Sequence, residues 1–352
     1  MTGHWLNKAA LGSIYFFGLS TLARPIFGGM GAILMLHRVR PTEVDDGFAP
    51  NAHLQVTPKF LERIVVSLAR AGFAFVSMDE VAARLSGESA GRSDFIAVTL
   101  DDGYRDNLEY AVPIFQTHKV PYTIYVAPGL IDGKAELWWE DLEAVIRRRS
   151  SFLLESPKGN IRFEVGSASE KRQTYAELLA FLTTKVDEDE QRRIVRHLNW
   201  QRGFDPVARC REEIMGWAEI GGLAEDPLCT IGAHTIHHFA LARLEAERAA
   251  DEIEQSARII ELETGKRPRH FAYPYGYPAA AGPREFAMAK AAGFATAVTT
   301  RHGVVTAAHG EHMHALPRIS LNGHFQQRPY LYAMLSGLPA RLANRGQALN
   351  VG

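Results

Sequence analysis

The sequence predicts an α/β fold built on a mainly parallel sheet, and three observations support this. Short apolar runs bounded by turn residues alternate along most of the chain with stretches of helical apolar spacing. The clearest runs, residues 31–39 and 95–100, reach polar residues near their ends. In parallel α/β proteins, functional side chains collect at the carboxyl ends of strands, so these polar residues are candidates for a site.

Length and composition set limits on the fold and its partners. The 352 residues exceed one typical domain but fit one large α/β domain with an insertion, and 46% hydrophobic residues permit a sizeable core. A formal net charge of −1 gives no overall attraction to nucleic acid or to anionic lipid. Cys210 and Cys229 are too few for a disulfide framework and favour a reducing compartment, although one disulfide stays open.

Residues 1–29 form an apolar N-terminal segment. Its apolar stretch, residues 9–23, follows Lys8 and precedes Arg24, and it is too short to span a bilayer as a helix. We expect a helix that covers the α/β domain or lies on a membrane surface with Tyr15, Phe16 and Phe17 inserted. The apolar region of a signal peptide is the alternative. The expected location is cytoplasmic or peripheral to the inner membrane, with export as the alternative.

The strand at 95–100 ends in two adjacent carboxylates, Asp101 and Asp102, followed by Gly103. Adjacent residues cannot face the same way on a regular strand. In a turn that leaves the strand, both carboxylates can reach one cavity, where one binds a metal and the other handles a proton. A solvated turn before a helix N-cap at Asp106 or Asn107 is the simpler alternative.

A pair of histidines follows a second short apolar run. His234 and His238 are four residues apart, so one helical turn would bring both imidazoles to the same side. Two histidines and one carboxylate leave open positions on a divalent cation, as in a catalytic zinc site. A structural or incidental histidine pair is the alternative, and His237 is expected to be a bystander.

The other elements follow in order along the chain. Thr57 and Pro58 are the N-cap and first residue of a predicted helix, which Gly72 closes. We predict strands at 73–76, 122–126, 270–273, 295–299 and 316–319, helices at 57–68, 79–85, 108–116, 241–262 and 285–292, and from 327 onward one helix with a loose end from 340.

Residues 138–214 interrupt this alternation and are predicted to be an insertion. A helix begins at Trp138, a hairpin covers 152–165 with its turn at 158–160, and the charged stretch 174–198 predicts two helices. The insertion is either a surface elaboration or a lid and substrate wall.

Taken together, these motifs resemble the polysaccharide deacetylases of carbohydrate esterase family 4, the NodB-like group. Residues 99–103, Thr-Leu-Asp-Asp-Gly, are similar to the first motif of that family, and residues 234–238, His-Thr-Ile-His-His, to its second. Residues 271–276, Phe-Ala-Tyr-Pro-Tyr-Gly, resemble the third, Arg-x-Pro-Tyr. The resemblance covers about 30–135 and 215–320. It implies a distorted (β/α) barrel with fewer closing strands than usual.

The resemblance also implies domain limits and site residues. The barrel would span 30–326, interrupted by the mostly helical insertion at 138–214, with an N-terminal helix at 1–29 and a C-terminal helix and tail at 327–352. By analogy, Asp101 is the catalytic base. Asp102, His234 and His238 hold one divalent metal ion, with Zn²⁺ favoured and Co²⁺, Mn²⁺ or Ni²⁺ open.

A histidine on the first strand points to one subgroup. Leu-Met-Leu-His-Arg-Val, with His37, resembles the circularly permuted subgroup that includes poly-N-acetylglucosamine deacetylases. In that subgroup the histidine protonates the leaving group, so the resemblance implies that His37 is the general acid.

The third motif departs from the family pattern. The arginine that braces the catalytic aspartate is replaced by Ala272, and Arg318, at another predicted strand end, is the position that would substitute for it. The fourth motif of the family is not recognisable. The residues expected to contact substrate or the oxyanion are Pro274, Tyr275, Arg318, Trp138 and Trp139, with the two tryptophans stacking on a sugar face.

The resemblance therefore implies a metal-dependent hydrolase that removes N-acetyl groups from an amino sugar in a bacterial surface polysaccharide or its lipid-linked precursor. Its expected partners are an N-acetylated glycan or lipid-linked amino sugar, and no nucleic acid. An O-acetyl esterase and a non-glycan amidase that use the same site stay open. A catalytically weak glycan-binding protein also stays open, and Ala272 is the residue that favours it.

Overall fold

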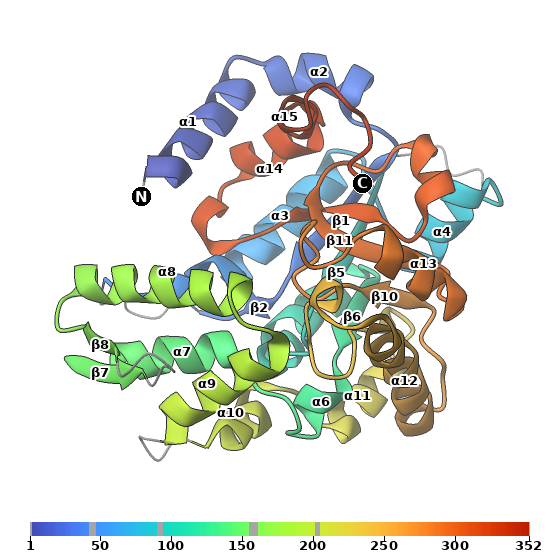
Figure 1. The fold of residues 1–352 in the computed structure, drawn as a ribbon. Helices are drawn as coiled ribbons and strands as arrows, with labels where there is room; N and C mark the ends of the chain where they lie inside the picture. Colours follow the sequence, from blue (N-terminus) through green and yellow to red (C-terminus); the bar gives the residue numbers. More distant parts are fainter. Residues whose placement is uncertain (1, 42–46, 90–93, 155–160, 201–204, 352) are drawn as a thin grey trace.

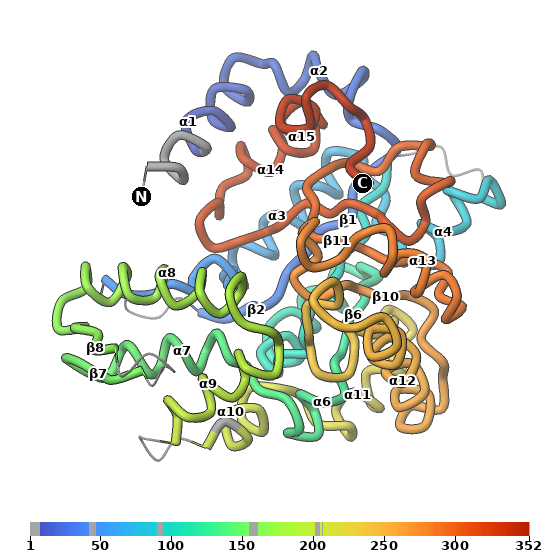
Figure 2. Tube along the Cα trace, in the orientation of Figure 1, coloured from blue at the N-terminus to red at the C-terminus, as the bar shows by residue number. Residues whose placement is uncertain are grey.

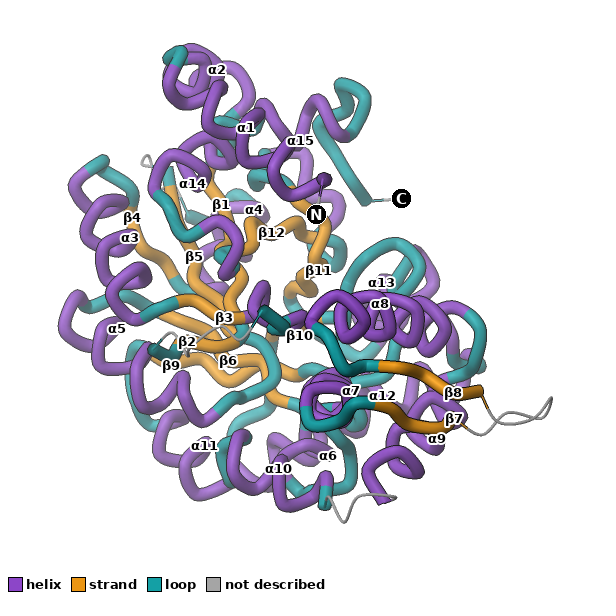
Figure 3. The backbone as a smooth tube through the Cα atoms, turned by 90° about the vertical axis from the view of Figure 1, so that its left-hand side faces the viewer, coloured by secondary structure: helices purple, strands orange, loops and turns teal. Residues whose placement is uncertain are grey.

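The computed structural model describes residues 2–41, 47–89, 94–154, 161–200 and 205–351. Its centre is a parallel barrel closed by seven strands in the order β1-β12-β11-β10-β9-β6-β5, with β5 pairing back to β1 from Phe95 to Leu100 (Figures 1 and 3). These strands are β1 Gly31–Leu36, β5 Phe95–Leu100, β6 Tyr122–Val126, β9 Cys229–Ala233, β10 His270–Ala272, β11 Thr296–His302 and β12 Leu316–Ser320. The predicted distorted barrel with fewer closing strands is confirmed.

Short strands and helices surround the barrel. Strand β4 (Ala74–Val76) pairs with β5, and β2 (Arg38–Val39) pairs with β3 (Gln55–Val56). The helices are α3 Pro58–Arg70, α4 Met78–Ser86, α5 Val112–His118, α6 Pro128–Ile131, α11 Trp217–Ala224, α12 Ala246–Thr264 and α13 Pro283–Ala291. Shorter turns are the 3₁₀ turns η1 Pro50–Leu54, η3 Leu241–Arg243, η4 Ala307–His312 and η5 Gly323–Phe325, and the π turn η2 Asn107–Ala111.

Local sequence signals explain most of these helices. Thr57 caps α3, with its hydroxyl accepting the N–H of Phe60 at 3.2 Å, as the sequence predicts. The long helix expected from 241 begins only at Ala246. Residues 241–243 form the separate turn η3, and the backbone of Leu244 (ψ 154°) and Glu245 (ψ 150°) is extended, which separates this turn from α12.

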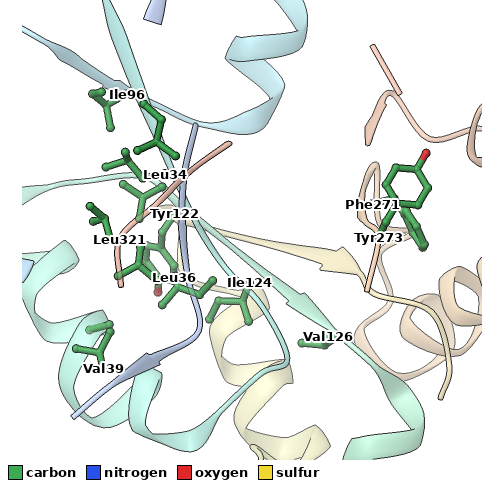
Figure 4. Packing of buried hydrophobic residues seen from close by; sticks show 14 of the residues in the cluster. Leu34, Leu36, Val39, Ile96, Tyr122, Ile124, Val126, Phe271, Tyr273 and Leu321 are labelled. Carbon is green, nitrogen blue, oxygen red and sulfur yellow. The ribbon is translucent and has the colours of Figure 1, made fainter. Parts of the chain in front are cut away.

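Side chains on the strands alternate between the barrel interior and the surrounding helices. Leu34, Leu36 and Ile124 point outward and pack with the helix side chains in the main core (Figure 4). Ile33 and Phe95 belong to a separate interior cluster. The same alternation carries the interior face of β1 on to His37 and that of β5 on to Asp101, so both residues emerge at the carboxyl end of the barrel.

The insertion has a hydrophobic core of its own. It consists of α7 Trp138–Arg147, the hairpin β7 Ser151–Leu154 and β8 Ile161–Glu164, α8 Ala168–Thr184, α9 Glu188–Trp200 and α10 Pro206–Glu213 (green in Figure 1). Trp138 lies in this core with Leu142 and Leu178. The predicted turn at 158–160 lies outside the described residues. Cys210 of α10 and Cys229 of β9 are free thiols.

The two ends of the chain pack together on one side of the barrel (Figures 1 and 2). The N-terminal segment forms α1 Thr2–Phe16 and α2 Leu19–Phe27, and the C-terminal segment forms α14 Arg328–Leu335 and α15 Leu338–Ala343. Each was expected to be one helix. The expectation is wrong because Gly18 and Gly337 both adopt a φ of 73°, which interrupts helical geometry.

None of the helices in the described part of the chain is long and apolar enough to cross a membrane alone. One pair, Lys8–Phe16 and Leu19–Phe27, has that length and composition together but is bent by 90°. The domain limits proposed from the sequence stay predictions.

Candidate active site

A cavity of about 560 Å³ lies at the carboxyl ends of the barrel strands. It brings together His37 after β1, the Asp101-Asp102 pair after β5, and His234 and His238 after β9. These residues come from three separate strand ends, so the site exists only in the closed barrel. The other residues that line the cavity are Met35, Pro50, Asn51, His53, Leu54, Trp138, Trp139, Tyr175, Leu179, Thr183, Tyr275, Tyr277, Thr300, His302, Ser320 and Asn322.

Asp102, His234 and His238 form a buried group that fits a metal ion. The Asp102 Oδ1 lies 3.4 Å from the Nε2 of His234 and 3.2 Å from the Nε2 of His238, yet this oxygen has no hydrogen-bond partner. Metal–ligand bonds of about 2.0–2.1 Å in a tetrahedron put ligand atoms roughly 3.3 Å apart. Both distances from the Asp102 oxygen are close to this value, and the three buried ligand atoms all lie within 4.8 Å of one another, an arrangement that a shared cation satisfies.

The hydrogen bonds of His234 orient it for this role. Its Nδ1 lies 2.7 Å from the carbonyl oxygen of Ala272 and donates to it, which turns Nε2 toward Asp102. The ring of His238 is held by packing instead, with its centroid 4.9 Å from those of Trp139 and of Tyr275. Burial lowers the pKa of His238 to about 4, which keeps this imidazole neutral.

The backbone between the two histidines is not helical, so the expected helical turn is wrong. The Thr235 hydroxyl accepts the N–H of His238 at 3.0 Å. The Glu252 carboxylate accepts the N–H groups of Ile236 and His237, each at 2.9 Å. Thr235 and His238 have positive φ, which a right-handed helical turn does not allow, so the two imidazoles that face Asp102 meet through an irregular bend instead.

Unusual backbone conformations concentrate at this cavity. Six non-glycine residues of the described chain have positive φ, and four of them are site residues: Asp102 (73°), Thr235 (60°), His238 (56°) and Tyr275 (60°). Such conformations are uncommon outside glycine and persist only where surrounding contacts hold them. Most of the strained non-glycine backbone of the described chain therefore lies at the candidate site.

Arg318 of β12 pairs with Asp101 at the end of β5, past the single intervening strand β1. Its Nη1 and Nη2 each donate to one oxygen of Asp101 at 2.7 Å, and its Nε donates to the Thr299 carbonyl at 2.9 Å. Both side chains are almost fully buried. Burial alone would raise the pKa of Asp101, but the Arg318 guanidinium outweighs it and holds this pKa below its usual value.

Ala272 occupies the position where the family pattern has arginine, and it lies in the interior cluster with Tyr125 and Val298. The guanidinium that reaches Asp101 comes instead from β12, two strands from β10. The geometry thus brings Arg318 to the place that the sequence suggested for it, beside the carboxylate rather than facing substrate.

His37 lies beside the same carboxylate but does not bind it directly. Its Nε2 is 3.9 Å from the Asp101 Oδ2, which is too long for a hydrogen bond. The side chain is partly exposed and lines the cavity, so its Nε2 can contact a bound molecule.

A buried charge cluster connects the barrel to the insertion directly behind the site. Arg38 donates through Nε to Asp106 at 2.8 Å and contacts Glu140 of α7 at 3.4 Å and Glu213 of α10 at 2.5 Å. Burial raises the pKa of Glu140 to about 7, although Arg38 opposes this shift. This cluster positions α7, which carries two cavity residues, against the barrel.

The predicted substrate residues are placed unequally. Tyr275 lines the cavity, whereas Pro274 is buried beside it. Trp138 and Trp139 also line the cavity but are only 1% and 7% exposed. Their Nε1 atoms donate to the hydroxyls of Tyr275 at 2.7 Å and of Tyr104 at 3.1 Å. These contacts make the two rings part of the cavity wall, and stacking on a sugar stays a prediction.

Two residues that support the histidine loop have no signal in the sequence. Arg192 of α9 is buried and donates to the carbonyl of His238 at 3.1 Å, and Glu252 of α12 holds the loop from the other side. Both lie in charged helical stretches that read as solvent-exposed. Their burial arises from the insertion and the barrel packing together, which local patterns do not show.

Comparisons with known proteins agree with this geometry. The polysaccharide deacetylase family model matches residues 172–296, which include the second and third motifs. A search of curated protein sequences gives no match.

Three solved structures share the fold. The deacetylase PplD from Streptococcus pyogenes has a TM-score of 0.57 at 17% identity, covering 86% of this chain and 97% of that one. IcaB from Ammonifex degensii has a TM-score of 0.54 at 17% identity, covering 87% and 98%. The de-N-acetylase from Aggregatibacter actinomycetemcomitans has a TM-score of 0.51 at 13% identity, covering 82% and 93%.

The barrel, the motifs and the family match together define the class of this protein. The polysaccharide deacetylase model matches residues 172–296 and the barrel is of the NodB-like type, so the resemblance stated from the motifs is confirmed. The expected enzyme class, a hydrolase of the deacetylase type, is confirmed as well.

Proposed function

We propose that this protein is a metal-dependent N-deacetylase that acts on an amino sugar of a bacterial surface polysaccharide or of its lipid-linked precursor. One observation carries the proposal: adjacent carboxylates have separate partners. Asp102 faces the Nε2 atoms of His234 and His238, whereas Asp101 is bound by Arg318. One dipeptide thus supplies both a metal ligand and an ionised base.

Asp102, His234 and His238 would hold one divalent cation, and their two nitrogens and one oxygen suit zinc, with Co²⁺, Mn²⁺ and Ni²⁺ as alternatives. When bound, such a cation polarises a carbonyl and lowers the pKa of water. The buried, neutral imidazole of His238 and the oriented Nε2 of His234 suit this role.

Asp101 would take the proton from the attacking water. Its low pKa keeps it ionised, and the two hydrogen bonds from Arg318 fix its orientation. Arg318 therefore acts through Asp101 as a positioning residue.

His37 would donate a proton to the departing nitrogen. An amine is a poor leaving group unless it is protonated, so amide hydrolysis needs a general acid on the side of the leaving group. His37 lines the cavity near Asp101, and both can reach one bound acetamide.

The cavity suits a polar acceptor. Its volume lies within the roughly 300–1,000 Å³ of small-molecule sites, and Asn51, His53, Tyr277 and Asn322 offer hydrogen-bonding groups on its wall. The lipid-linked form of the acceptor is part of this proposal, and so is a location that is cytoplasmic or peripheral to the inner membrane, with export as the alternative.

The alternative of a glycan-binding protein without turnover is now less favoured. Ala272 favoured that alternative because it left Asp101 without the arginine that binds it in the family pattern. Arg318 donates two hydrogen bonds to Asp101 instead. O-acetyl ester hydrolysis remains the competing reaction, because the same base and cation would serve it without a proton donor.

The test measures acetate and free amine together, with acetylated chito-oligosaccharides and a lipid-linked N-acetylhexosamine as acceptors and an O-acetylated sugar as the comparison. We expect equal amounts of acetate and amine from an N-acetylated acceptor, loss of both on chelation, and recovery with Zn²⁺. Acetate only from the O-acetylated sugar would replace the proposal with an esterase.

A further inference from the structure

The helix α2 carries its apolar face toward solvent. Leu22 and Ile26 are 71% and 72% exposed, and Leu19 on the same face is 44% exposed. The face turned toward the protein holds the small residues Ser20 and Ala23, which are buried. A surface helix of a soluble protein normally shows the reverse order, with its apolar stripe turned inward.

Neighbouring residues extend this face. Phe16 and Phe17, at the junction of α1 and α2, are 77% and 78% exposed, and Leu342 of the adjacent α15 is 67% exposed. The terminal apolar face is defined here as Phe16, Phe17, Leu19, Leu22, Ile26 and Leu342. These six are more than half of the eleven exposed large hydrophobic residues of the described chain. Contiguous patches of this kind mark interaction sites.

The charge around the terminal apolar face is one-sided. Residues 1–42 and 312–352 contain no aspartate or glutamate, and they contain eight lysines and arginines. The whole chain has 39 basic and 40 acidic residues, so the remainder carries 31 basic and 40 acidic residues, a net charge of −9. Two of the eight, Arg38 and Arg318, are buried in ion pairs with Asp106 and Asp101 in the barrel. The four terminal helices themselves carry Lys8, Arg24, Arg328 and Arg341 and no acidic residue, so the charge on them is positive.

A basic pocket lies beside the helix on which α1 packs. Arg63 and Arg70 of α3 and Arg328 of α14 line this pocket of about 580 Å³, and Glu62 is the single acidic residue of its lining. The rings of Tyr15 in α1 and Tyr332 in α14 are 6.4 Å apart, which places α1 next to the pocket. Three guanidinium groups beside an apolar face match the charge of anionic lipid headgroups.

We propose that the terminal apolar face docks on a bilayer that contains anionic lipid. The helices α1 and α2 lie in the interface with the side chains of Phe16, Phe17, Leu22 and Ile26 among the acyl chains, and the nearby arginines meet the headgroups. The two helices are bent by 90° to one another, which suits a contact in which both lie in the interface. This docking goes beyond the deacetylase reaction and does not depend on it.

The face is connected to the active site. Lys8 of α1 lies over the ring of Phe325, 6.0 Å from its centroid, and the neighbouring His324 stacks on His53, whose side chain lines the cavity. These contacts link α1 to one wall of the cavity. On the proposed function, a protein docked through α1 and α2 suits an acceptor with a lipid anchor.

The test is co-sedimentation of the full chain with vesicles of phosphatidylcholine alone and with 30% phosphatidylglycerol added. The variant Phe17→Ser/Leu22→Ser/Ile26→Ser removes three members of the face. The matched control, Trp200→Ser/Leu262→Ser, removes two side chains that are 77% and 83% exposed elsewhere. A second variant, Arg341→Glu/Arg345→Glu, reverses charge beside the face.

We expect the wild type and the control to bind the anionic vesicles equally. The triple variant should bind at least tenfold less, and the charge variant should lose most of its preference for anionic over neutral vesicles. Acetate release from a short soluble acceptor should be the same in all four proteins, which separates this proposal from the proposed function.

Three results would overturn the docking proposal. The first is no binding of the wild type to either vesicle. The second is equal losses in the triple variant and the control. The third is a wild-type dimer in solution that the triple variant converts to a monomer without any vesicle binding, which would assign the face to a second copy of the chain. If the triple variant does not fold, the charge variant and Leu22→Ser alone decide between the same outcomes.

Discussion

The mouth of the barrel and the terminal apolar face break the usual pattern of burial in opposite directions. At the mouth, Arg318, Asp101 and Asp102 are ionisable and at most 1% exposed. On the terminal face, Phe16 and Phe17 are apolar and more than three quarters exposed. A buried charge is tolerated where neighbouring groups pair with it. An exposed apolar surface is tolerated where a binding partner or a membrane covers it.

The two regions also differ in what holds them in place. The mouth depends on specific hydrogen bonds and on strained backbone, so single substitutions there should be costly. The terminal face contributes little to folding, so substitutions there should leave the unfolding free energy nearly unchanged. The following predictions test this contrast from its largest expected effect to its smallest.

The variant His37→Ala should lower acetate release from an N-acetylated sugar by about 10²- to 10⁴-fold, because the leaving amine then lacks a proton donor. Hydrolysis of 4-nitrophenyl acetate, whose leaving group needs no proton, should fall by less than about tenfold. Steady-state kinetics with both substrates provide the measurement. Equal losses on the two substrates would show that His37 does not act as the general acid.

The variant Arg318→Met should lower the unfolding free energy by about 3–5 kcal/mol, because it leaves the buried Asp101 carboxylate without a partner. Urea denaturation followed by circular dichroism measures this. The control is Arg258→Met, which breaks an exposed i,i+4 pair with Glu254 and should cost less than about 0.5 kcal/mol. Similar costs for the two variants would remove the distinction between the mouth and the surface.

The variant Ala272→Arg should lower the unfolding free energy by about 1–3 kcal/mol without raising acetate release. The new side chain would enter the filled interior cluster, where Arg318 already provides the cation for Asp101. The matched control is Ala291→Arg on exposed α13, which should be neutral. Increased acetate release at unchanged stability would indicate that Arg318 does not fill the role of the missing arginine.

The variant Glu140→Gln tests the buried charge that connects barrel and insertion. Burial raises the pKa of Glu140 to about 7 in the folded protein, above its ordinary 4.5, so the folded state binds this proton more tightly than the unfolded chain. The resulting stabilisation is complete below about pH 4.5 and is lost as the pH rises to 7. The glutamine variant should therefore be more stable than wild type by about 1–3 kcal/mol at pH 8.

The difference between Glu140→Gln and the wild type should disappear near pH 4.5, as measured by denaturation at both pH values. A surface control, Glu254→Gln, should show no such pH dependence. A difference that is the same at both pH values would show that Glu140 does not titrate in this range.

The variant Leu22→Ser should change the unfolding free energy by less than about 0.5 kcal/mol, because its side chain is 71% exposed. Thermal and urea denaturation of the protein without vesicles measure this. A loss of 2 kcal/mol or more would mean that the terminal face packs against the protein in solution, and the contrast with the mouth would fail.

The fold and the residues at the carboxyl ends of the strands could be predicted from the sequence. Short apolar runs identified β5 and β6, and the strand ends placed Asp101, Asp102, His37 and His234 at one edge of the barrel. The apolar runs show where each strand ends. Because all parallel strands present their carboxyl ends to the same side, the residues that follow the strands must lie at one edge of the barrel.

The sequence failed where distant side chains decide local structure. The bend from His234 to His238 was expected to be helical, but Glu252, from a helix that follows it, binds its backbone donors. Arg318 was suggested only by its position on a strand, since nothing local shows that its guanidinium reaches past β1 to Asp101. The inverted face of α2 is also invisible to periodicity, which reports that one face is apolar but not which way it points.

The most direct test of the central claim compares Asp101→Asn with Asp102→Asn, measuring bound zinc per chain and acetate release for each. The account predicts that Asp101→Asn binds one zinc ion but loses at least 10³-fold in acetate release, because only the base is removed. Asp102→Asn should lose both the zinc and the activity. If Asp101→Asn loses the metal, or if Asp102→Asn retains it and remains active, the separate roles assigned to the two carboxylates are wrong.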